Sequence, residues 1–198
     1  MKKCNFATRK PLTLTTMDSI PVKINLTDLV SGMPGITSVF GADLMDNCVV
    51  MLHRSGHTSP TSISIDGMEK EDMDIIWKDT FNEQMDRCYA DHQDNTEMAA
   101  VGISVLLAKQ ITGYTIISRS RKGTGFDYTL GDCNDELYIP KARLEISGIE
   151  KESLVNSINS RFRQKEQQVT PTDKTGLPAY ISIVEFSAPK ALFNKKAL

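Results

Sequence analysis

Cysteine, tryptophan and long apolar runs are scarce in this chain of 198 residues, which has four cysteines and one tryptophan. The cysteines lie far apart and form no Cys-x-x-Cys pair, which argues against a disulfide framework or a structural zinc site. The most apolar run, residues 98–108, is about half as long as the ~20 residues that cross a bilayer. The basic residues near the start precede no apolar segment of the kind found in signal peptides. We therefore expect a cytoplasmic protein with no membrane partner.

An excess of charge of either sign is also missing. Lysine and arginine total 23 and aspartate and glutamate 25, for a net charge of −2, so the total charge indicates neither a polybasic membrane protein nor a general nucleic-acid binder. The hydrophobic content of 40% is ordinary for a globular protein, which excludes a disordered or fibrous chain. The length suits one domain, which we divide into a β-rich portion (1–68) and an α/β core (69–198) that form one compact unit.

The first portion reads mainly as β structure. Short alternating or apolar runs predict strands at residues 12–15, 22–26, 48–53 and 62–66. The chain then becomes acidic, with ten acids and three bases between Glu69 and Glu97. The apolar side chains in this region recur at roughly the helical period and predict an amphipathic helix: Met73, Ile76, Trp77, Phe81, Cys88 and Tyr89.

The second portion alternates helices and strands. A helix that starts at Asn95 or Thr96 and continues through the apolar run 98–108 should be buried, with Gly102 and Ser104 allowing close packing on a sheet. Strands are expected at 114–120, 126–130 and 141–147, then a helix over 154–168 and a strand at 180–186. The chain is therefore predicted to be an α+β protein whose core has the element order αβββαβ.

Three acids fall at positions where they can form a site. Glu97 begins the buried helix, Asp127 enters the second strand of the core, and Glu145 lies on the polar face of the third. Adjacent strands would bring the side chains of Asp127 and Glu145 together. Two carboxylates beside a backbone carbonyl are hard-oxygen ligands for Mg²⁺ or Mn²⁺, and such an ion can activate water and neutralise charge on a phosphodiester.

This arrangement resembles the restriction-endonuclease-like, or PD-(D/E)XK, nuclease superfamily over roughly the last 105 residues. In that superfamily an acid on the first helix, an Asp at a strand start and a Glu-x-Lys on the next strand build the metal site. Glu97, Asp127 and Glu145-Ile146-Ser147 occupy the matching positions. The resemblance implies a metal-dependent nuclease in which Asp127 and Glu145 bind the ion and Glu97 assists. The segment 121–128 is also similar to uncharacterised bacterial proteins associated with mobile elements and phage defence.

Two positions depart from the superfamily pattern. Phe126 replaces the usual proline, and Ser147 replaces the lysine that would hold the attacking water. Lys141 lies six residues along the same strand face, at ~20 Å, and is too distant to substitute. Lys122, in the turn between the first two strands, is the better candidate for a displaced base or a phosphate contact.

Basic residues around these acids could line a nucleic-acid groove, with Arg119, Arg121, Lys122 and Arg143 as the candidate phosphate contacts and further bases at Lys141, Arg161, Arg163 and Lys165. An alternative hypothesis gives both acids purely structural roles, in which Asp127 orders the glycine-rich turn and Glu145 pairs with Arg143 or Arg119. In that case the protein would be a non-catalytic subunit of a multi-protein assembly. Asp127 and Glu145 converging in an open groove would favour the enzyme.

Overall fold

The computed structural model describes residues 22–134 and 137–196. Within these residues the chain forms one mixed sheet of eight strands, flanked by helices. The strands are β1 (Val22–Asn25), β2 (Thr61–Gly67), β3 (Glu71–Ile76), β4 (Thr115–Arg119), β5 (Tyr128–Asn134), β6 (Leu137–Ile149), β7 (Ala179–Glu185) and β8 (Lys190–Lys195). The α-helices are α1 (Ser38–Arg54), α2 (Glu83–Cys88), α3 (His92–Thr112) and α4 (Ile158–Val169), and the 3₁₀ helices are η1 (Leu26–Ser31) and η2 (Thr170–Thr175).

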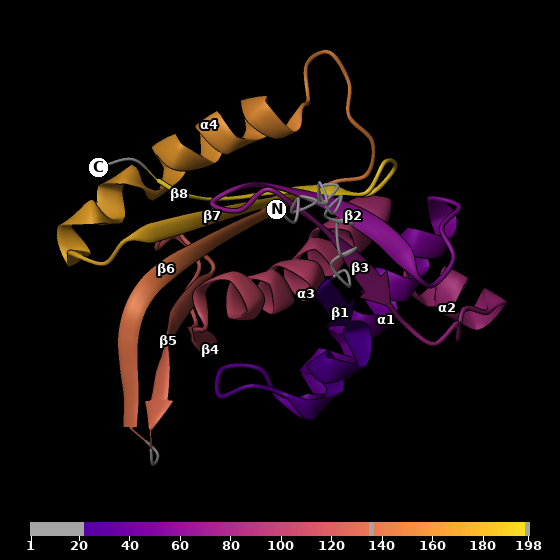
Figure 1. The fold of residues 1–198 in the computed structure, drawn as a ribbon, viewed down its shortest axis with the longest axis horizontal. Coiled ribbons are helices and arrows are strands. Elements are labelled where there is room, and N and C mark those ends of the chain that lie inside the picture. The colour runs from indigo at the N-terminus through magenta and orange to yellow at the C-terminus, as the bar shows by residue number, and fades with distance from the viewer. Residues whose placement is uncertain (1–21, 135–136, 197–198) are drawn as a thin grey trace, which may run out of the picture.

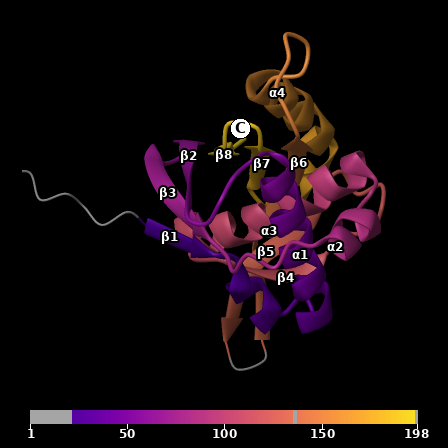
Figure 2. The same ribbon diagram turned by 90° about the vertical axis from the view of Figure 1, so that its right-hand side faces the viewer.

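The sheet has the strand order β1-β3-β2-β8-β7-β6-β5-β4. Strands β4, β5 and β6 form an antiparallel meander, β6 and β7 run parallel, and α4 lies in the connection between them. Figures 1 and 2 show α4 on one side of β6 and β7, with α1 and α3 on the other. The chain is thus an α+β protein, and its second half follows the expected order of helix, three strands, helix and strand, with β8 added at the end.

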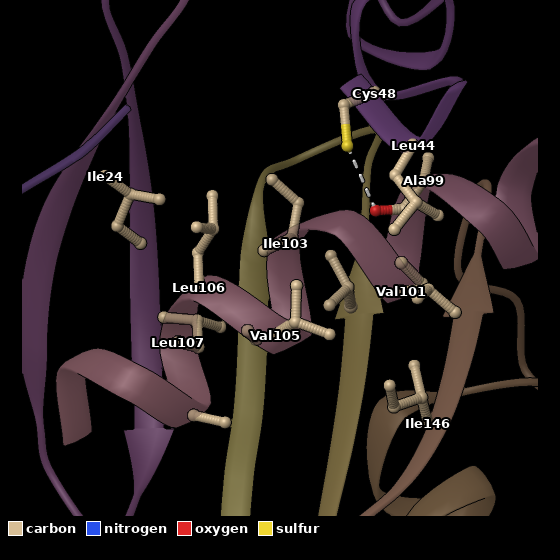
Figure 3. Close-up of a cluster of buried hydrophobic side chains, with 14 of the residues drawn as sticks. Ile24, Leu44, Cys48, Ala99, Val101, Ile103, Val105, Leu106, Leu107 and Ile146 are labelled. Atoms are coloured by element: carbon tan, nitrogen blue, oxygen red, sulfur yellow. Dashed lines mark hydrogen bonds between the residues drawn. The ribbon is translucent and has the colours of Figure 1, made fainter. Parts of the chain in front are cut away.

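Helix α3 lies at the centre of the main hydrophobic core, as the apolar run predicts (Figure 3). The Asp91 carboxylate accepts hydrogen bonds from the first backbone N–H groups, and Gly113, at φ 74°, ends the helix in the left-handed conformation. The helix therefore starts earlier than expected, and Asn95 and Thr96 are buried inside it instead of capping it. The asparagine amide donates to the backbone carbonyl and side-chain oxygens of Asn47 on α1.

Close packing around α3 involves both faces of the helix. A Cβ at Gly102 would lie 2.5 Å from the Cys48 Sγ atom, so this glycine permits contact with α1, not with the sheet as we expected. The Ser104 hydroxyl faces the sheet and shares a 2.7 Å hydrogen bond with Ser182 on β7. Helix α3 is thus packed between α1 and the sheet.

The expected strand at 48–53 is wrong, because these residues lie in α1. Residues 48–52 are all buried, and a short continuous apolar run of this kind does not distinguish a strand from a buried helix. The Thr37 hydroxyl, which accepts from the Phe40 N–H, caps the helix. The expected strand at 62–66 is confirmed by β2, and that at 22–26 ends at Asn25, because η1 begins at Leu26. The expected strand at 12–15 lies outside the described residues.

The expected acidic helix is also wrong. Residues 71–76 form β3, in which the buried Met73 and Ile75 alternate with Asp72 and Asp74. This period of two outweighs the approximate helical spacing of the more distant apolar residues, because β2 and β1 pair with β3 on either side. Only α2, which has six residues, is helical between β3 and α3.

Strand β6 has the expected polar face, but this face is covered. Ala142, Leu144 and Ile146 are buried against the α3 side, and Arg143 and Glu145 lie on the opposite, polar face. That face is covered by α4, so Arg143 and Glu145 are each only 1% exposed. The helix itself begins at Ile158, later than expected, and Leu154 and Val155 are exposed in the preceding loop.

Candidate functional site

The antiparallel register of β5 and β6 brings Asp127 and Glu145 together. Tyr128 pairs with Leu144, so Asp127, one residue earlier, lies opposite Glu145. The Asp127 N–H donates to the Leu144 carbonyl at 2.9 Å, and the Ile146 N–H donates to Asp127 Oδ2 at 2.8 Å. The charge of Asp127 raises the pKa of Glu145, as expected for two neighbouring carboxylates.

Glu145 is held at one oxygen and unsatisfied at the other. Its Oε1 atom accepts from the Lys165 ammonium at 2.6 Å and from the Gln168 amide at 2.7 Å. Its Oε2 atom is buried and has no hydrogen-bond partner among the described residues. Burial is the main cause that raises the pKa of Glu145 to about 7, with Asp127 adding to it against the opposing effect of Lys165 and Gln168.

Burial also raises the pKa of Asp127 above its ordinary value. The Ile146 N–H and the positive charges of Lys165 and Arg119 oppose this shift, whereas the charge of Glu97 adds to it. The three acids named by the sequence therefore influence one another through space. Glu145 is buried, Asp127 is half-buried opposite it, and Glu97 is exposed on α3 nearby.

A pocket of about 170 Å³ opens at Asp127, and we call it the carboxylate pocket. Glu145, the strand neighbour of Asp127, does not line it. Its wall includes Glu97 from α3, Arg119 from β4, Asp127, Ser147 from β6, and Arg161 and Lys165 from α4. The Arg161 guanidinium donates to the Ser147 hydroxyl at 3.3 Å and to the Asn156 side chain at 2.8 Å. Acidic and basic side chains from four elements therefore meet at one opening.

The role of Lys165 was not predicted from the sequence, which indicated only a surface base. Arg161, Lys165 and Gln168 follow one another at helical spacings of four and three residues, so they share one face of α4. That spacing is the signal that could have found them. The position of Glu145 under this face becomes visible only when α4 is placed on the sheet.

Lys122 does not line the carboxylate pocket. It lies with Arg119 and Arg121 along a neighbouring groove of about 500 Å³, which we call the basic groove. Asp127 and Gln168 also line this groove, and because Arg119 and Asp127 line the carboxylate pocket as well, the two hollows adjoin each other. Three of the four predicted nucleic-acid contacts therefore do lie together.

Arg143 is the exception and corrects the predicted set. Its guanidinium is buried and donates to the carbonyls of Leu177 and Val169, to the Thr172 hydroxyl and to Asp173 Oδ1. These bonds fasten the end of α4 and η2 to the sheet. The placement leaves Arg143 no exposed donor for a phosphate, because its side chain is 1% exposed.

The alternative hypothesis, in which the two acids have only structural roles, predicted other partners than the structure shows. Glu145 pairs with Lys165 and Gln168 instead of Arg143 or Arg119, and Asp127 bonds to the β6 backbone. A metal would have two candidate carboxylate ligands here, Asp127 and Glu145. Throughout residues 22–134 and 137–196, no group of three or more His, Cys, Asp or Glu side chains is placed to hold a metal ion.

Comparison with known proteins finds no family model, no curated protein and no solved structure that matches this chain. Among the helices in the described part of the chain, none combines the length and the apolar character needed to cross a membrane.

Proposed function

We propose that this protein binds Mg²⁺ or Mn²⁺ between Asp127 and Glu145 and cleaves phosphodiester bonds of nucleic acid. The observation that carries the proposal is the Oε2 atom of Glu145. This acceptor is buried and has no hydrogen-bond partner among the described residues, and its carboxylate lies next to that of Asp127. An unsatisfied buried acceptor is costly. A cation held by both carboxylates would supply the missing partner and remove their mutual repulsion.

The donor set suits a hard cation with few protein ligands. Mg²⁺ is commonly held by one or two carboxylates, with waters and substrate phosphate oxygens completing its coordination. The absence of a third acidic side chain at ligand distance among the described residues is compatible with such a site. When bound, the ion would lower the pKa of a water and neutralise charge on the phosphate.

The chain's own residues would share the remaining work. Lys165, whose ammonium donates to Glu145 Oε1, would orient a water or a phosphate oxygen. It would thus replace the lysine of the superfamily pattern, whose position is occupied by Ser147. Arg119 and Arg161 line the same pocket and would neutralise the phosphate charge. The order of α3, β4, β5, β6, α4 and β7 supports the resemblance to the restriction-endonuclease-like core.

Thermal melting with and without Mn²⁺ or Mg²⁺ tests the proposal. We expect the metal to raise the melting temperature of the wild type by several degrees, because it binds the folded state preferentially. Asp127→Asn should abolish this rise and leave the metal-free protein as stable as the wild type or slightly more so. Manganese-dependent cleavage of nucleic acid should be lost in the same variant.

Asp132→Asn is the matched control, because Asp132 is a half-exposed acid of β5 that pairs with Lys141 at 3.4 Å. This variant should keep both the metal-dependent rise and the cleavage. Melting that is independent of metal in the wild type and in both variants would contradict the proposal.

A non-catalytic interaction subunit is the second candidate. It is favoured by the missing third acid within the described residues and by the direct contact of Lys165 with Glu145, which neutralises that carboxylate without a metal. If the protein has this function, the wild type shows neither stabilisation by metal nor cleavage of nucleic acid, so Asp127→Asn changes neither measurement.

A further inference from the structure

The basic groove has features that go beyond a general attraction for phosphate. Its floor and walls include Arg119, Arg121 and Lys122 together with one aromatic side chain, Phe126. We infer that this groove binds a single-stranded segment of nucleic acid and leads it to the carboxylate pocket. The inference rests on the proposed function for what happens to the bound strand, but the binding itself is separately measurable.

Charge in the groove runs against that of the whole chain. The chain carries a net charge of −2, whereas the groove is lined by three bases and a single acid, Asp127. The three bases are exposed, so their charges are available to phosphates.

Phe126 gives the groove a surface for a base. It is half-buried, packing against the cluster under α4 while also lining the groove. An aromatic ring in a positively charged groove is the arrangement by which proteins stack unpaired bases without sequence preference. In a duplex each base is already stacked on its neighbours, so an intact duplex offers the phosphates but no base for Phe126.

The turn that carries the bases is held in place before any strand binds. The Thr124 hydroxyl donates to the carbonyl of Arg121 at 2.8 Å and lies 3.2 Å from that of Phe126. Gly125, at φ 84°, approaches α4 so closely that an added Cβ would lie 3.0 Å from the Gln168 carbonyl oxygen. A groove fixed in this way loses little conformational entropy on binding.

The groove also points to the carboxylates. Arg119 and Asp127 line both hollows, and Gln168, at the edge of the groove, donates to Glu145 Oε1 at 2.7 Å. The groove volume of about 500 Å³ lies within the range of sites that enclose a small ligand, which gives room for a nucleotide. A phosphate next to a base on Phe126 would thus be directed toward Arg119, which lines both hollows, and Lys165 in the carboxylate pocket.

Fluorescence anisotropy with labelled oligothymidylate, measured in EDTA so that no cleavage occurs, tests the inference. We expect the single strand to bind at least about tenfold more tightly than a duplex of equal length. Phe126→Leu, which keeps an apolar side chain in the cluster, should weaken single-strand binding about tenfold and leave duplex binding unchanged. Lys122→Gln should weaken both and reduce the slope of log affinity against log salt by about 0.7 for the single strand.

Lys70→Gln is the matched control, because Lys70 is 82% exposed and lies in the β2–β3 turn, away from the groove. It should bind as the wild type does, and all variants should melt at the wild-type temperature. Equal affinity for single strand and duplex, equal losses in Lys122→Gln and Lys70→Gln, or equally tight binding of oligoglutamate would overturn the inference.

The two proposals fail in different ways. If oligothymidylate binds as expected but metal does not stabilise the protein, the groove stands and the nuclease proposal falls. If metal stabilises the protein through Asp127 but the single strand is not preferred, the groove inference alone falls.

Discussion

At the scale of single residues, the Glu145 carboxyl group determines how the site responds to pH. Its ordinary pKa of 4.5 is raised to about 7 by burial and by the charge of Asp127. Between these values the unfolded chain has released the proton and the folded protein still holds it. Folding therefore takes up a proton, and stability must fall as the pH rises through this window. The full effect is on the order of 3 kcal/mol.

Urea unfolding of the metal-free protein between about pH 5 and about pH 8 measures this effect. We expect the wild type to lose stability as the pH increases, and Glu145→Gln to lose much less, since the amide does not titrate. Asp127, whose pKa is also raised, contributes in the same direction and remains in both proteins. Parallel curves for the two proteins would show that Glu145 does not titrate in this range.

The residues of the site differ in how far the sequence could identify them. Asp127 and Glu145 could be predicted from the sequence. Asp127 follows a glycine-rich turn, and Glu145 alternates with apolar residues on a strand. The burial of Arg143 was not predictable, since it depends on contacts with the end of α4 and with η2, which lie 26 and 30 residues later in the chain. Nor was the Lys165–Glu145 contact, which requires the same docking.

At the scale of elements, the close packing of α1 on α3 depends on the absence of a Cβ atom at Gly102. Gly102 has space for no Cβ unless Cys48 moves, because the Cys48 Sγ atom would lie 2.5 Å away (Figure 3 shows Cys48 bonded to the Ala99 carbonyl). We expect Gly102→Ala to lower the free energy of unfolding by about 1–3 kcal/mol through overpacking. The measurement is urea unfolding.

A double-mutant cycle isolates this contact. Cys48→Ala removes the sulfur, so Gly102→Ala should cost less in that background, with a coupling on the order of 1 kcal/mol. Cys88 is exposed on α2 and supplies the control, because Gly102→Ala and Cys88→Ala should add without coupling. Additive effects of Gly102→Ala and Cys48→Ala would mean that the helices separate to accept the methyl group.

Elements with a clear period were predictable, and those with mixed signals were not. Alternation marks β6, and continuous apolar character marks α3, so both were found with small errors at their ends. In contrast, part of α1 was predicted to be a strand, and β3 was predicted to be part of a helix. Each is a short run whose pattern suits either structure alone, and its neighbours in the sheet or core decide between them.

At the scale of the whole molecule, the predicted boundary at residue 68 falls within the β2–β3 hairpin and separates no structural unit. Strand β8, from the end of the described chain, pairs in parallel with β2, and this pairing joins the β1-β3-β2 strands to the rest of the sheet. The main core likewise includes side chains from both portions, such as Ile63 and Phe193. The two predicted portions therefore share one sheet and one core.

We expect such a molecule to unfold in one cooperative step. Trp77, the single tryptophan of the chain, is 6% exposed and follows β3, which pairs with β1 and β2. Its fluorescence therefore reports on the β1-β3-β2 end of the sheet, whereas far-ultraviolet circular dichroism reports on all helices and strands. The two urea transitions should coincide. Phe193→Ala, at the buried junction on β8, should shift both transitions equally, by about 3–5 kcal/mol. Separate midpoints, or a shift of the dichroism alone, would mean that the β1-β3-β2 end of the sheet folds independently of the rest, because Trp77 would then keep its environment while β8 lost its packing.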